Sequence, residues 1–313
     1  MDIRELKSFL HVARAGSFNR AAAELYIAQP ALSRQIAKLE EEIGLPLFIR
    51  HGRGVRLTAA GARLLERAEI ITQMVGETGE HVRASVDEER GYLAVGLPPT
   101  MGTLIGAELV RSFRAVFPRV SLHIREGQST SLQEWVLDRR VDMAVVYNQP
   151  PLDAFNVRPL FSEPMILIAP PGTKMPKEGF HIRDLANLPL ILPSLPHSNR
   201  RVIEHAAVQH GIRLRVELEV DSVALTKQLV KAGVAYSILT SIAIRDEAAR
   251  GEVLAQTINR PSIRSTVAIT TLREATYSRF VTAWTAMLRD KLAGFVKNEH
   301  WRDDIVWLDE GGS

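Results

Sequence analysis

The hydrophobic positions of the first ninety residues repeat at helical spacing in several successive segments. The most informative segment is 28–44, in which one apolar stripe is formed by Leu32, Ile36, Leu39 and Ile43. Pro30 suits the first turn of a helix, because its missing N–H leaves no hydrogen bond unmade there. The opposite face carries polar side chains with little apolar bulk, namely Gln29, Ser33, Arg34 and Lys38. Such a helix can cover a core, or it can lie in the major groove of DNA.

Two shorter segments with helical patterns precede this one. The first has an apolar face formed by Ile3, Leu6, Phe9, Leu10 and Ala13. Gly16 is expected to end it, and Ser17 is a good N-cap for the second helix, 18–25. The short connection 26–28 leads into the polar-faced helix. Two short helices joined by a tight turn, the second with a polar outer face, predict a helix-turn-helix.

A basic hairpin is predicted directly after these helices. Residues 47–50 and 55–57 read as short strands around a tip bracketed by Gly52 and Gly54. The hairpin carries three arginines and no acidic residue: Arg50, Arg53 and Arg56. Arginines at a turn are often only solvated, but after a helix-turn-helix they favour a wing that contacts phosphates or the minor groove. Residues 1–63 hold ten Lys/Arg against six Asp/Glu, so the positive charge of the chain is concentrated here.

A long helical pattern runs from Thr58, a candidate N-cap, to about Glu89. Its apolar positions fall near a 3.5-residue spacing, which is typical of a coiled-coil seam and predicts a dimer. The candidate dimerisation residues are Leu64, Ala68, Ile71, Val75 and Val82. The alternative is a helix that packs on its own domain.

From residue 91 onwards, strands and helices alternate, which predicts an α/β fold with a mainly parallel sheet. Strands are expected at 92–97, 120–124, 143–147, 165–169, 190–192, 216–220, 235–239 and 267–271. Helices are expected between about 104 and 117, around 132–136, at 199–211 and 223–232, and from about 280 to 295. Beyond residue 298 we expect a loose tail, pinned by Trp301 or Trp307.

Composition excludes some classes of protein and leaves nucleic-acid binding open. Hydrophobic content of 46% and charged content of 24% are ordinary for a globular protein. There is no cysteine, no export signal and no apolar run near the ~20 residues of a membrane span, which suits a cytoplasmic protein without membrane contact. No phosphate-binding loop, metal-binding motif or nucleophile motif is present, so we expect no catalytic residues, no metal and no cofactor.

The N-terminal pattern resembles the winged helix-turn-helix of the LysR-type transcriptional regulators. The resemblance runs through residues 18–61, FNRAAAELYIAQPALSRQIAKLEEEIGLPLFIRHGRGVRLTAAG. Positions that match the family are Ala21, Ala22, Leu25, Gln29, Pro30, Ser33, Arg34, Leu39, Glu40, Leu45, Leu47, Phe48, Arg50, Thr58 and Gly61. Together with the charge pattern, this gives the candidate DNA-binding residues Gln29, Pro30, Ser33, Arg34, Lys38, Arg50, Arg53 and Arg56. The fragments RGVRLTAAG, VGLPPT and VSLHIREG look most similar to nitrogen-assimilation-control-type regulators.

The C-terminal pattern resembles, more loosely, the effector-binding domain of the same family, which is similar to periplasmic solute-binding proteins. The resemblance implies a DNA-binding domain at 1–58, a linker helix at 59–90, an effector domain at 91–300 and a tail at 301–313. The effector domain would have two α/β subdomains, 91–161 with 267–300 and 162–266, joined by two crossing strands. Ala235 and Thr240 stand where the family more usually has glycine and proline.

A ligand cleft between these subdomains would be lined by helix N-termini and polar loop residues. The candidates are Thr100, Gln128, Ser129, Asn148, Ser194, Asn199, Arg200, Ser222 and Thr240, with Arg200 or Arg201 supplying positive charge. They suit a small, anionic effector, although hydroxyls beside helix starts can be simple caps.

The function predicted from these observations is a LysR-type regulator. It would bind an interrupted palindrome of double-stranded DNA as a homodimer or homotetramer, respond to the effector and contact RNA polymerase. The alternative is a solute-binding or catalytic α/β protein with an accessory N-terminal domain.

Overall fold

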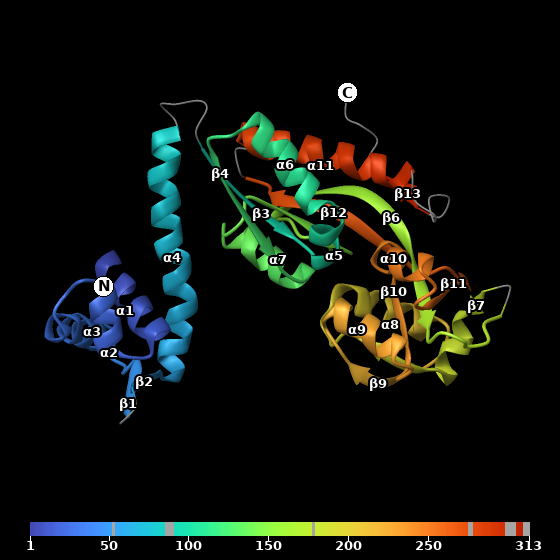
Figure 1. The fold of residues 1–313 in the computed structure, drawn as a ribbon, viewed down its shortest axis with the longest axis horizontal. Coiled ribbons are helices and arrows are strands. Elements are labelled where there is room, and N and C mark those ends of the chain that lie inside the picture. Colours follow the sequence, from blue (N-terminus) through green and yellow to red (C-terminus); the bar gives the residue numbers. More distant parts are fainter. Residues whose placement is uncertain (52–53, 85–90, 177–178, 275–277, 298–304, 309–313) are drawn as a thin grey trace. The chain divides into compact units, whose positions relative to one another are not determined.

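The computed structural model describes residues 1–51, 54–84, 91–176, 179–274, 278–297 and 305–308. The chain forms two compact units, Met1–Tyr92 and Leu93–Ser313 (Figure 1). None of the helices within the described ranges is both long and apolar enough to cross a membrane.

Three helices of the first unit end where their capping residues indicate. They are α1 (Ile3–Ala15), α2 (Phe18–Glu24) and α3 (Gln29–Ile43). Gly16 ends α1 in the left-handed conformation, with φ of 61°, and Ser17 caps α2 by accepting the N–H of Arg20. Pro30 lies in the first turn of α3, so the predicted helix starts and stops are confirmed.

A two-stranded hairpin and one long helix complete the unit. The antiparallel strands are β1 (Phe48–His51) and β2 (Gly54–Leu57), followed by α4 (Ala59–Ala84). Thr58 caps α4, because its Oγ1 accepts the N–H of Gly61 at 2.9 Å. The predicted extension of this helix to Glu89 lies outside the described residues. All these elements share one core, whose largest side chains are Leu6, Phe9, Leu10, Phe18, Leu32, Ile36, Leu39, Leu47 and Phe48.

The second unit contains two α/β lobes built on one mixed sheet of order β4-β3-β5-β12-β6-β10-β8-β9. The first lobe holds β3 (Gly91–Leu97), β4 (Val120–Glu126) and β5 (Met143–Tyr147). Its helical elements are α5 (Pro99–Met101), η1 (Gly102–Gly106), α6 (Ala107–Val116), α7 (Ser129–Leu137) and α11 (Arg279–Lys297). α6 and α11 cover one face of the sheet and α7 covers the other (Figure 1). Trp284 of α11 is fully buried in the resulting core.

In the second lobe, helical elements also cover both faces of the sheet. Its strands are β8 (Pro189–Leu192), β9 (Arg215–Glu219) and β10 (Tyr236–Thr240). Its helical elements are η2 (Ile182–Asn187), α8 (Ser198–Gln209), α9 (Val223–Lys231), η3 (Ile242–Ile244) and α10 (Arg245–Ala249). Residues of β6 alternate between two cores, with Met165 and Leu167 facing one and Ile166 and Ile168 the other.

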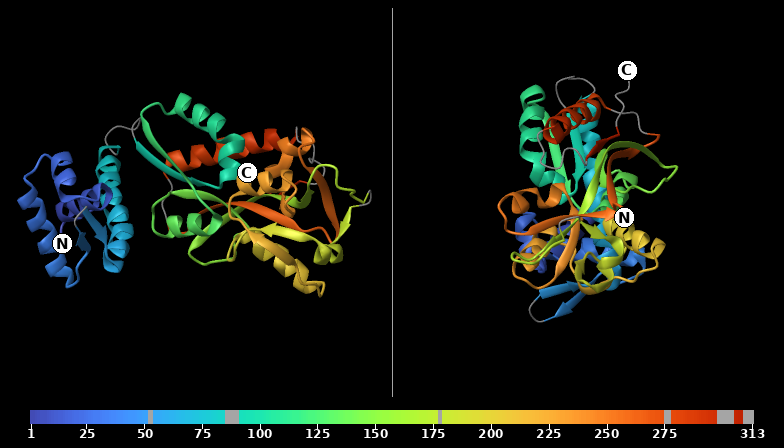
Figure 2. Two further views of the ribbon diagram at one scale, coloured as in Figure 1. Left: turned by 60° about the horizontal axis from the view of Figure 1, so that its bottom comes forward. Right: turned by 90° about the vertical axis from the view of Figure 1, so that its right-hand side faces the viewer.

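Two long strands cross from one lobe to the other (Figure 2). They are β6 (Phe155–Ala169) and β12 (Arg264–Leu272), which pair antiparallel along their whole shared length. β11 (Leu254–Arg260) joins β6 and β7 (Phe180–His181) in the second lobe. β13 (Val306–Trp307) pairs with β6, and Trp307 stacks on Phe161 with ring centroids 6.0 Å apart. The tail is therefore anchored at Trp307, whereas Trp301 lies outside the described residues.

The crossing strands correct two predictions. Pairs within each lobe are parallel, such as β3 with β5 and β8 with β10, but β6 and β12 are antiparallel to their neighbours. The sheet is therefore mixed rather than mainly parallel, because these strands connect lobes instead of following a helix. β6 also begins ten residues before the predicted 165–169, and β11 was not predicted at all.

Candidate functional site

α3 presents a polar face on the outside of the first unit. Leu32, Ile36 and Leu39 are buried against α1 and α2, which leaves Arg34 exposed on the outer side. Gln29 donates from Nε2 to Ser33 Oγ at 2.8 Å, so these two side chains are held together at the start of the helix. Pro30 is exposed beside them. Arginine and glutamine in such a place match the acceptor and donor edges of bases in a major groove.

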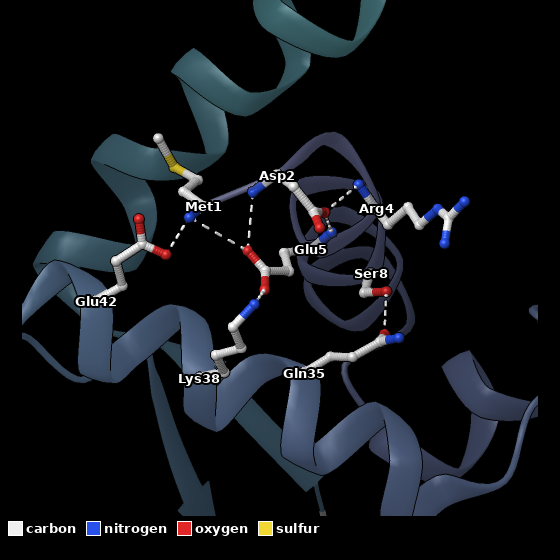
Figure 3. A network of polar contacts seen from close by, with 8 residues as sticks. All are labelled: Met1, Asp2, Arg4, Glu5, Ser8, Gln35, Lys38 and Glu42. Carbon is white, nitrogen blue, oxygen red and sulfur yellow. Dashed lines mark hydrogen bonds and ion pairs between the residues drawn. The ribbon is translucent and has the colours of Figure 1, made fainter.

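The structure places Lys38 differently from the other predicted DNA-binding residues of α3. Its Nζ lies 2.6 Å from Glu5 Oε1, on the side of the helix that faces α1 (Figure 3). The Lys38 ammonium and the Asp2 backbone N–H hold the pKa of Glu5 down at about 2. The same side of α3 carries Gln35, which accepts from Ser8 at 2.7 Å. The charge of Lys38 is thus matched within the protein, so this residue braces α3 against α1.

The hairpin is fixed to the helices through its backbone. Glu40 Oε1 accepts the N–H groups of Leu47 and Phe48 at 2.7 and 3.1 Å. Gly54 approaches Gly16 so closely that a Cβ on Gly54 would lie 2.4 Å from the Gly16 carbonyl oxygen. Arg56 is exposed on β2, whereas Arg53 and the side chain of Arg50 lie outside the described residues.

α4 divides the predicted dimerisation residues into two groups. Ala68 is fully buried and Leu64 packs against the core of the same unit, so both belong to this protomer's own core. Ile71 and Val75, further along the helix, are 37% and 49% exposed. The side chain of Val82 lies outside the described residues. The first half of α4 therefore packs on its own domain, which was the alternative to a dimer seam. The exposed apolar positions of the helix begin at Ile71.

One exposed aromatic residue of this unit was not predicted as a contact. Tyr26 lies in the turn between α2 and α3, is 95% exposed and has a φ of 56°. A non-glycine residue in the left-handed region is uncommon and points to a constrained turn. An aromatic residue in a helix-turn-helix turn was the available sequence signal.

The second unit has a cavity of about 480 Å³ lined by residues of both lobes. It receives six of the nine predicted effector residues, which are Thr100, Gln128, Ser129, Asn199, Ser222 and Thr240. The starts of α5, α7, α8 and α9 all contribute to its wall. Helix N-termini carry partial positive charge and unpaired N–H groups, so their convergence favours a negatively charged ligand group. The Gln128 side chain makes no capping bond to α7.

Two of the cavity residues already use their hydroxyls locally. Ser129 is buried, and its Oγ accepts the N–H of Tyr147 at 2.9 Å. Ser222 Oγ accepts the N–H of Leu225 at 3.3 Å, as an N-cap does. Ser222 is therefore a helix cap, which was the alternative to a ligand contact.

Three predicted effector residues do not line this cavity, and Arg200 is the clearest correction. It is only 6% exposed and donates to Glu204 at 2.8 Å, to the Pro193 carbonyl at 2.8 Å and to Glu219 at 3.4 Å. Its charge is matched inside the second lobe and is not offered to a ligand.

Asn148 and Ser194 form hydrogen bonds to other residues of the protein close to the cavity. Asn148 donates to Asn199 Oδ1 at 2.7 Å and to Ser265 Oγ at 3.0 Å, and it accepts the N–H of Thr266 at 2.9 Å. It therefore links β5, α8 and β12 where the lobes meet. Ser194 donates to Asp221 at 2.7 Å.

The cavity also contains charged and aromatic residues that the sequence did not single out. Glu126, Tyr147, His197 and Asp221 line it. Two hydrogen bonds from Ser194 lower the pKa of Asp221, and burial lowers the pKa of His197. No lysine or arginine is found among the described residues of this wall.

A fully buried carboxyl lies directly behind the cavity. Glu163 of β6 accepts from Ser241 Oγ and from the Ile242 N–H, each at 2.9 Å. Burial raises its pKa to about 7 in spite of these bonds. The same burial, together with the nearby Glu163, raises the pKa of Tyr147 well above its ordinary value.

Comparisons with known proteins agree with both units. Residues 3–62 match the family model "Bacterial regulatory helix-turn-helix protein, lysR family", and residues 87–293 match the model "LysR substrate binding domain". The chain is 32% identical over 302 residues to the HTH-type transcriptional regulator BbuR of Bordetella bronchiseptica, covering 96% of this chain and 93% of that one. It is 30% identical to the nitrogen assimilation regulatory protein nac of Escherichia coli, covering 78% and 80%. The resemblance to nitrogen-assimilation-control regulators is thus only weakly supported.

Solved structures show the same fold. CbnR, a LysR family transcriptional regulator, aligns with a TM-score of 0.71 at 22% identity, covering 93% of this chain and 99% of that one. HinK, a LysR family transcriptional regulator from Pseudomonas aeruginosa, aligns with a TM-score of 0.57 at 25% identity, covering 93% and 99%. The relatives named here are regulators rather than enzymes. The chain therefore belongs to the LysR family, as a DNA-binding transcriptional regulator with an effector-binding domain.

Proposed function

We propose that this regulator binds an interrupted palindromic operator as a homodimer or dimer of dimers, and that a small carboxylate in the interlobe cavity switches it. The proposal of a carboxylate ligand rests on the convergence of four helix N-termini on one cavity. The partial charges of these helices take the role that was first assigned to Arg200. RNA polymerase is the expected partner of the DNA-bound form.

On the DNA side, Arg34 is the proposed base-reading residue, assisted by Gln29 and Ser33. Arg34 is exposed on the face of α3 opposite the buried stripe, which is the geometry of a recognition helix. Arg56 and the neighbouring arginines of the hairpin, Arg50 and Arg53, would contact phosphates or the minor groove. Lys38 is left out of this set because it pairs with Glu5.

The dimer contact is assigned to the part of α4 that begins at Ile71. Ile71 and Val75 are four residues apart on one helix and remain exposed after the unit has formed its core. Burial of such a stripe against a second copy of the helix would remove apolar surface from water.

The cavity indicates more about the ligand than its negative charge. Glu126 and Asp221 line the wall together with hydroxyl and amide groups. Carboxylates in the wall repel a bare anion but accept hydrogen bonds from hydroxyl or ammonium groups. We therefore propose a small acid that also carries hydroxyl or amino groups, with its carboxylate toward the helix N-termini.

A matched pair of compounds tests this proposal. Thermal unfolding of the full-length protein would be measured with hydroxy acids and amino acids and with the amide of each. A ligand of the native state raises the apparent Tm by mass action, so an active acid should raise it while its amide should not. Equal effects of acid and amide would contradict the proposed carboxylate.

Variants then locate the site. Thr100→Val and Gln128→Leu remove polar groups from the wall with little change in volume, and Ser129→Ala is avoided because it would strand the Tyr147 N–H. Both variants should retain binding to DNA from the region upstream of the protein's own gene, followed by fluorescence anisotropy. They should lose the shift in Tm and in the DNA footprint that the active acid produces. A wild-type response in both variants would remove these two residues from the site, while the regulator assignment would stand.

A further inference from the structure

The wall of the interlobe cavity carries negative charge that no cation of the wall matches. Glu126 and Asp221 line the cavity, and none of the described residues beside them is a lysine or an arginine. His197 also lines it, but burial lowers the pKa of His197 and so favours the neutral imidazole. A ligand that carried only a carboxylate would therefore meet two like charges, whereas a ligand with a cationic group would pair with them.

Asp221 is held as an acceptor at the edge of the second lobe, two residues before α9. Its Oδ1 accepts the backbone N–H of Ser194 at 2.9 Å and the Ser194 hydroxyl at 2.7 Å. These bonds lower the pKa of Asp221, so the carboxylate is ionised at neutral pH. Both bonds use Oδ1, and within the described residues Oδ2 is left for a ligand.

Glu126 presents the second carboxylate from the first lobe, as the last residue of β4. The carboxylate lies against the backbone of Gly102 at the start of η1, where a Cβ would be only 2.6 Å from Glu126 Oε1. Glycine at this position leaves room for the side chain of Glu126. In the part of the chain that the structure describes, Glu126 forms no ion pair with a lysine or an arginine. The two carboxylates thus line one cavity from opposite lobes.

A buried hydroxyl of the same wall lacks a hydrogen-bond partner. Tyr147, the last residue of β5, is 6% exposed and lines the cavity. Its Oη has no partner within the described ranges, and neither has Oε1 of the buried Glu163 behind the cavity. Unpaired polar groups are costly when they are buried. The wall therefore suits a ligand that brings hydrogen-bond donors as well as a carboxylate.

We propose that the effector is an amino acid in its zwitterionic form, an inference that rests on the proposed effector site. Its ammonium group lies between Glu126 and Asp221, and its carboxylate faces the starts of α7, α8 and α9, which carry partial positive charge. A cavity of about 480 Å³ has room for a small amino acid. Because the ammonium group contacts both lobes, binding favours the arrangement of the lobes in which the two carboxylates are close.

Matched ligands test for the ammonium group. Thermal unfolding of the full-length protein is measured with each of the protein amino acids, and titration calorimetry gives the Kd of those that raise the Tm. Each active amino acid is then compared with the 2-hydroxy acid of the same side chain, in which a hydroxyl replaces the ammonium group. We expect at least one amino acid to bind. Its hydroxy acid should bind at least tenfold more weakly, because it lacks the positive charge.

Variants at the two carboxylates locate the ammonium group. Glu126→Gln and Asp221→Asn keep an acceptor oxygen and remove the charge, so Ser194 retains its partner. Each should weaken the amino acid at least tenfold in Kd, equivalent to about 1.4 kcal/mol, and should not weaken the hydroxy acid. Glu134→Gln makes the same change at an exposed position of α7 outside the cavity and should leave both Kd values unchanged. Should Asp221→Asn fail to fold, the exposed Glu126 carries the test.

The outcomes separate this inference from the proposed function. A hydroxy acid that bound as tightly as its amino acid would overturn the inference and leave a carboxylate effector in place. Unchanged affinity for the amino acid in both carboxylate variants, or failure of every amino acid to bind, would also overturn it. An amino acid whose amide bound equally well would instead contradict the proposed carboxylate contact, while the ammonium contact would stand.

Discussion

Replacing Glu163 by glutamine should remove the loss of stability that ionisation of this carboxyl causes in the second unit between about pH 4.5 and pH 7. In the unfolded chain the carboxyl ionises near 4.5, whereas in the folded protein burial raises its pKa to about 7. Below pH 4.5 the group is protonated in both states, and its stabilising contribution is fully present. As pH rises toward 7, only the unfolded chain loses its proton, so the free energy of unfolding falls.

The size of the effect follows from the shift. A difference of about 2.5 pKa units corresponds to about 3 kcal/mol of stability lost by pH 8. Glutamine keeps an oxygen for Ser241 and Ile242 but cannot ionise. Glu163→Gln should therefore resemble the parent near pH 5 and exceed it in stability near pH 8. Tyr147 and Arg264, the other ionisable groups that act on this carboxyl, are the same in both proteins.

Urea unfolding followed by tryptophan fluorescence provides the measurement. All four tryptophans lie in the second unit, so the signal reports that unit. The decisive quantity is the difference in free energy of unfolding between variant and parent at several pH values. A difference that stays constant from about pH 5 to about pH 8 would refute the reasoning, because the titrating group would then be elsewhere.

Three further predictions concern the first unit. Arg34→Ala should relax base preference at one position of each operator half-site, at a cost of about 1–3 kcal/mol in binding free energy. Competition binding with single-base operator variants measures this, and an unchanged preference in the folded variant would show that Arg34 does not read a base. Gly54→Ala should lower the Tm more than Gly44→Ala. Both glycines have positive φ, but only at Gly54 would a Cβ collide with a neighbour, 2.4 Å from a carbonyl oxygen. Equal losses of Tm in the two variants would show that the hairpin can shift to make room. Ile71→Glu combined with Val75→Glu should lower the mass measured by sedimentation and weaken operator binding, and a double variant that kept the parental mass would place the dimer contact elsewhere.

Local sequence signals predicted the first unit well because its boundaries depend on neighbouring residues. Gly16, Ser17 and Thr58 act on helices that begin or end beside them, and the apolar stripe of α3 faces the core as expected. The side chain of Lys38 could not be placed in the same way. Its partner, Glu5, lies 33 residues earlier, and only the packing of α3 on α1 brings the two together.

For Arg200, by contrast, a local sequence signal against a role in ligand binding was present and was not used. Arg200 is followed four residues later by Glu204, and that spacing on a helix favours an internal ion pair over a free charge. Glu126 and Asp221 were not among the candidates because those were chosen as hydroxyl, amide and cationic groups suited to an anion, although their neighbours in the sequence, Gln128 and Ser222, were predicted to line the cavity. The polar residues Asn156 and Arg158 likewise concealed the first half of β6, which is exposed rather than buried there.

The attachment of the hairpin to the helices has a consequence for the entropy of DNA binding. Backbone groups of Leu47, Phe48 and Val55 are bonded to Glu40 and Gly16, which belong to the helical part of the unit. Their amide hydrogens should exchange with solvent only when the helices themselves open, so this base of the hairpin and the recognition helix form one cooperative unit. The anchored part of the wing is therefore ordered before DNA arrives, and binding does not have to order it.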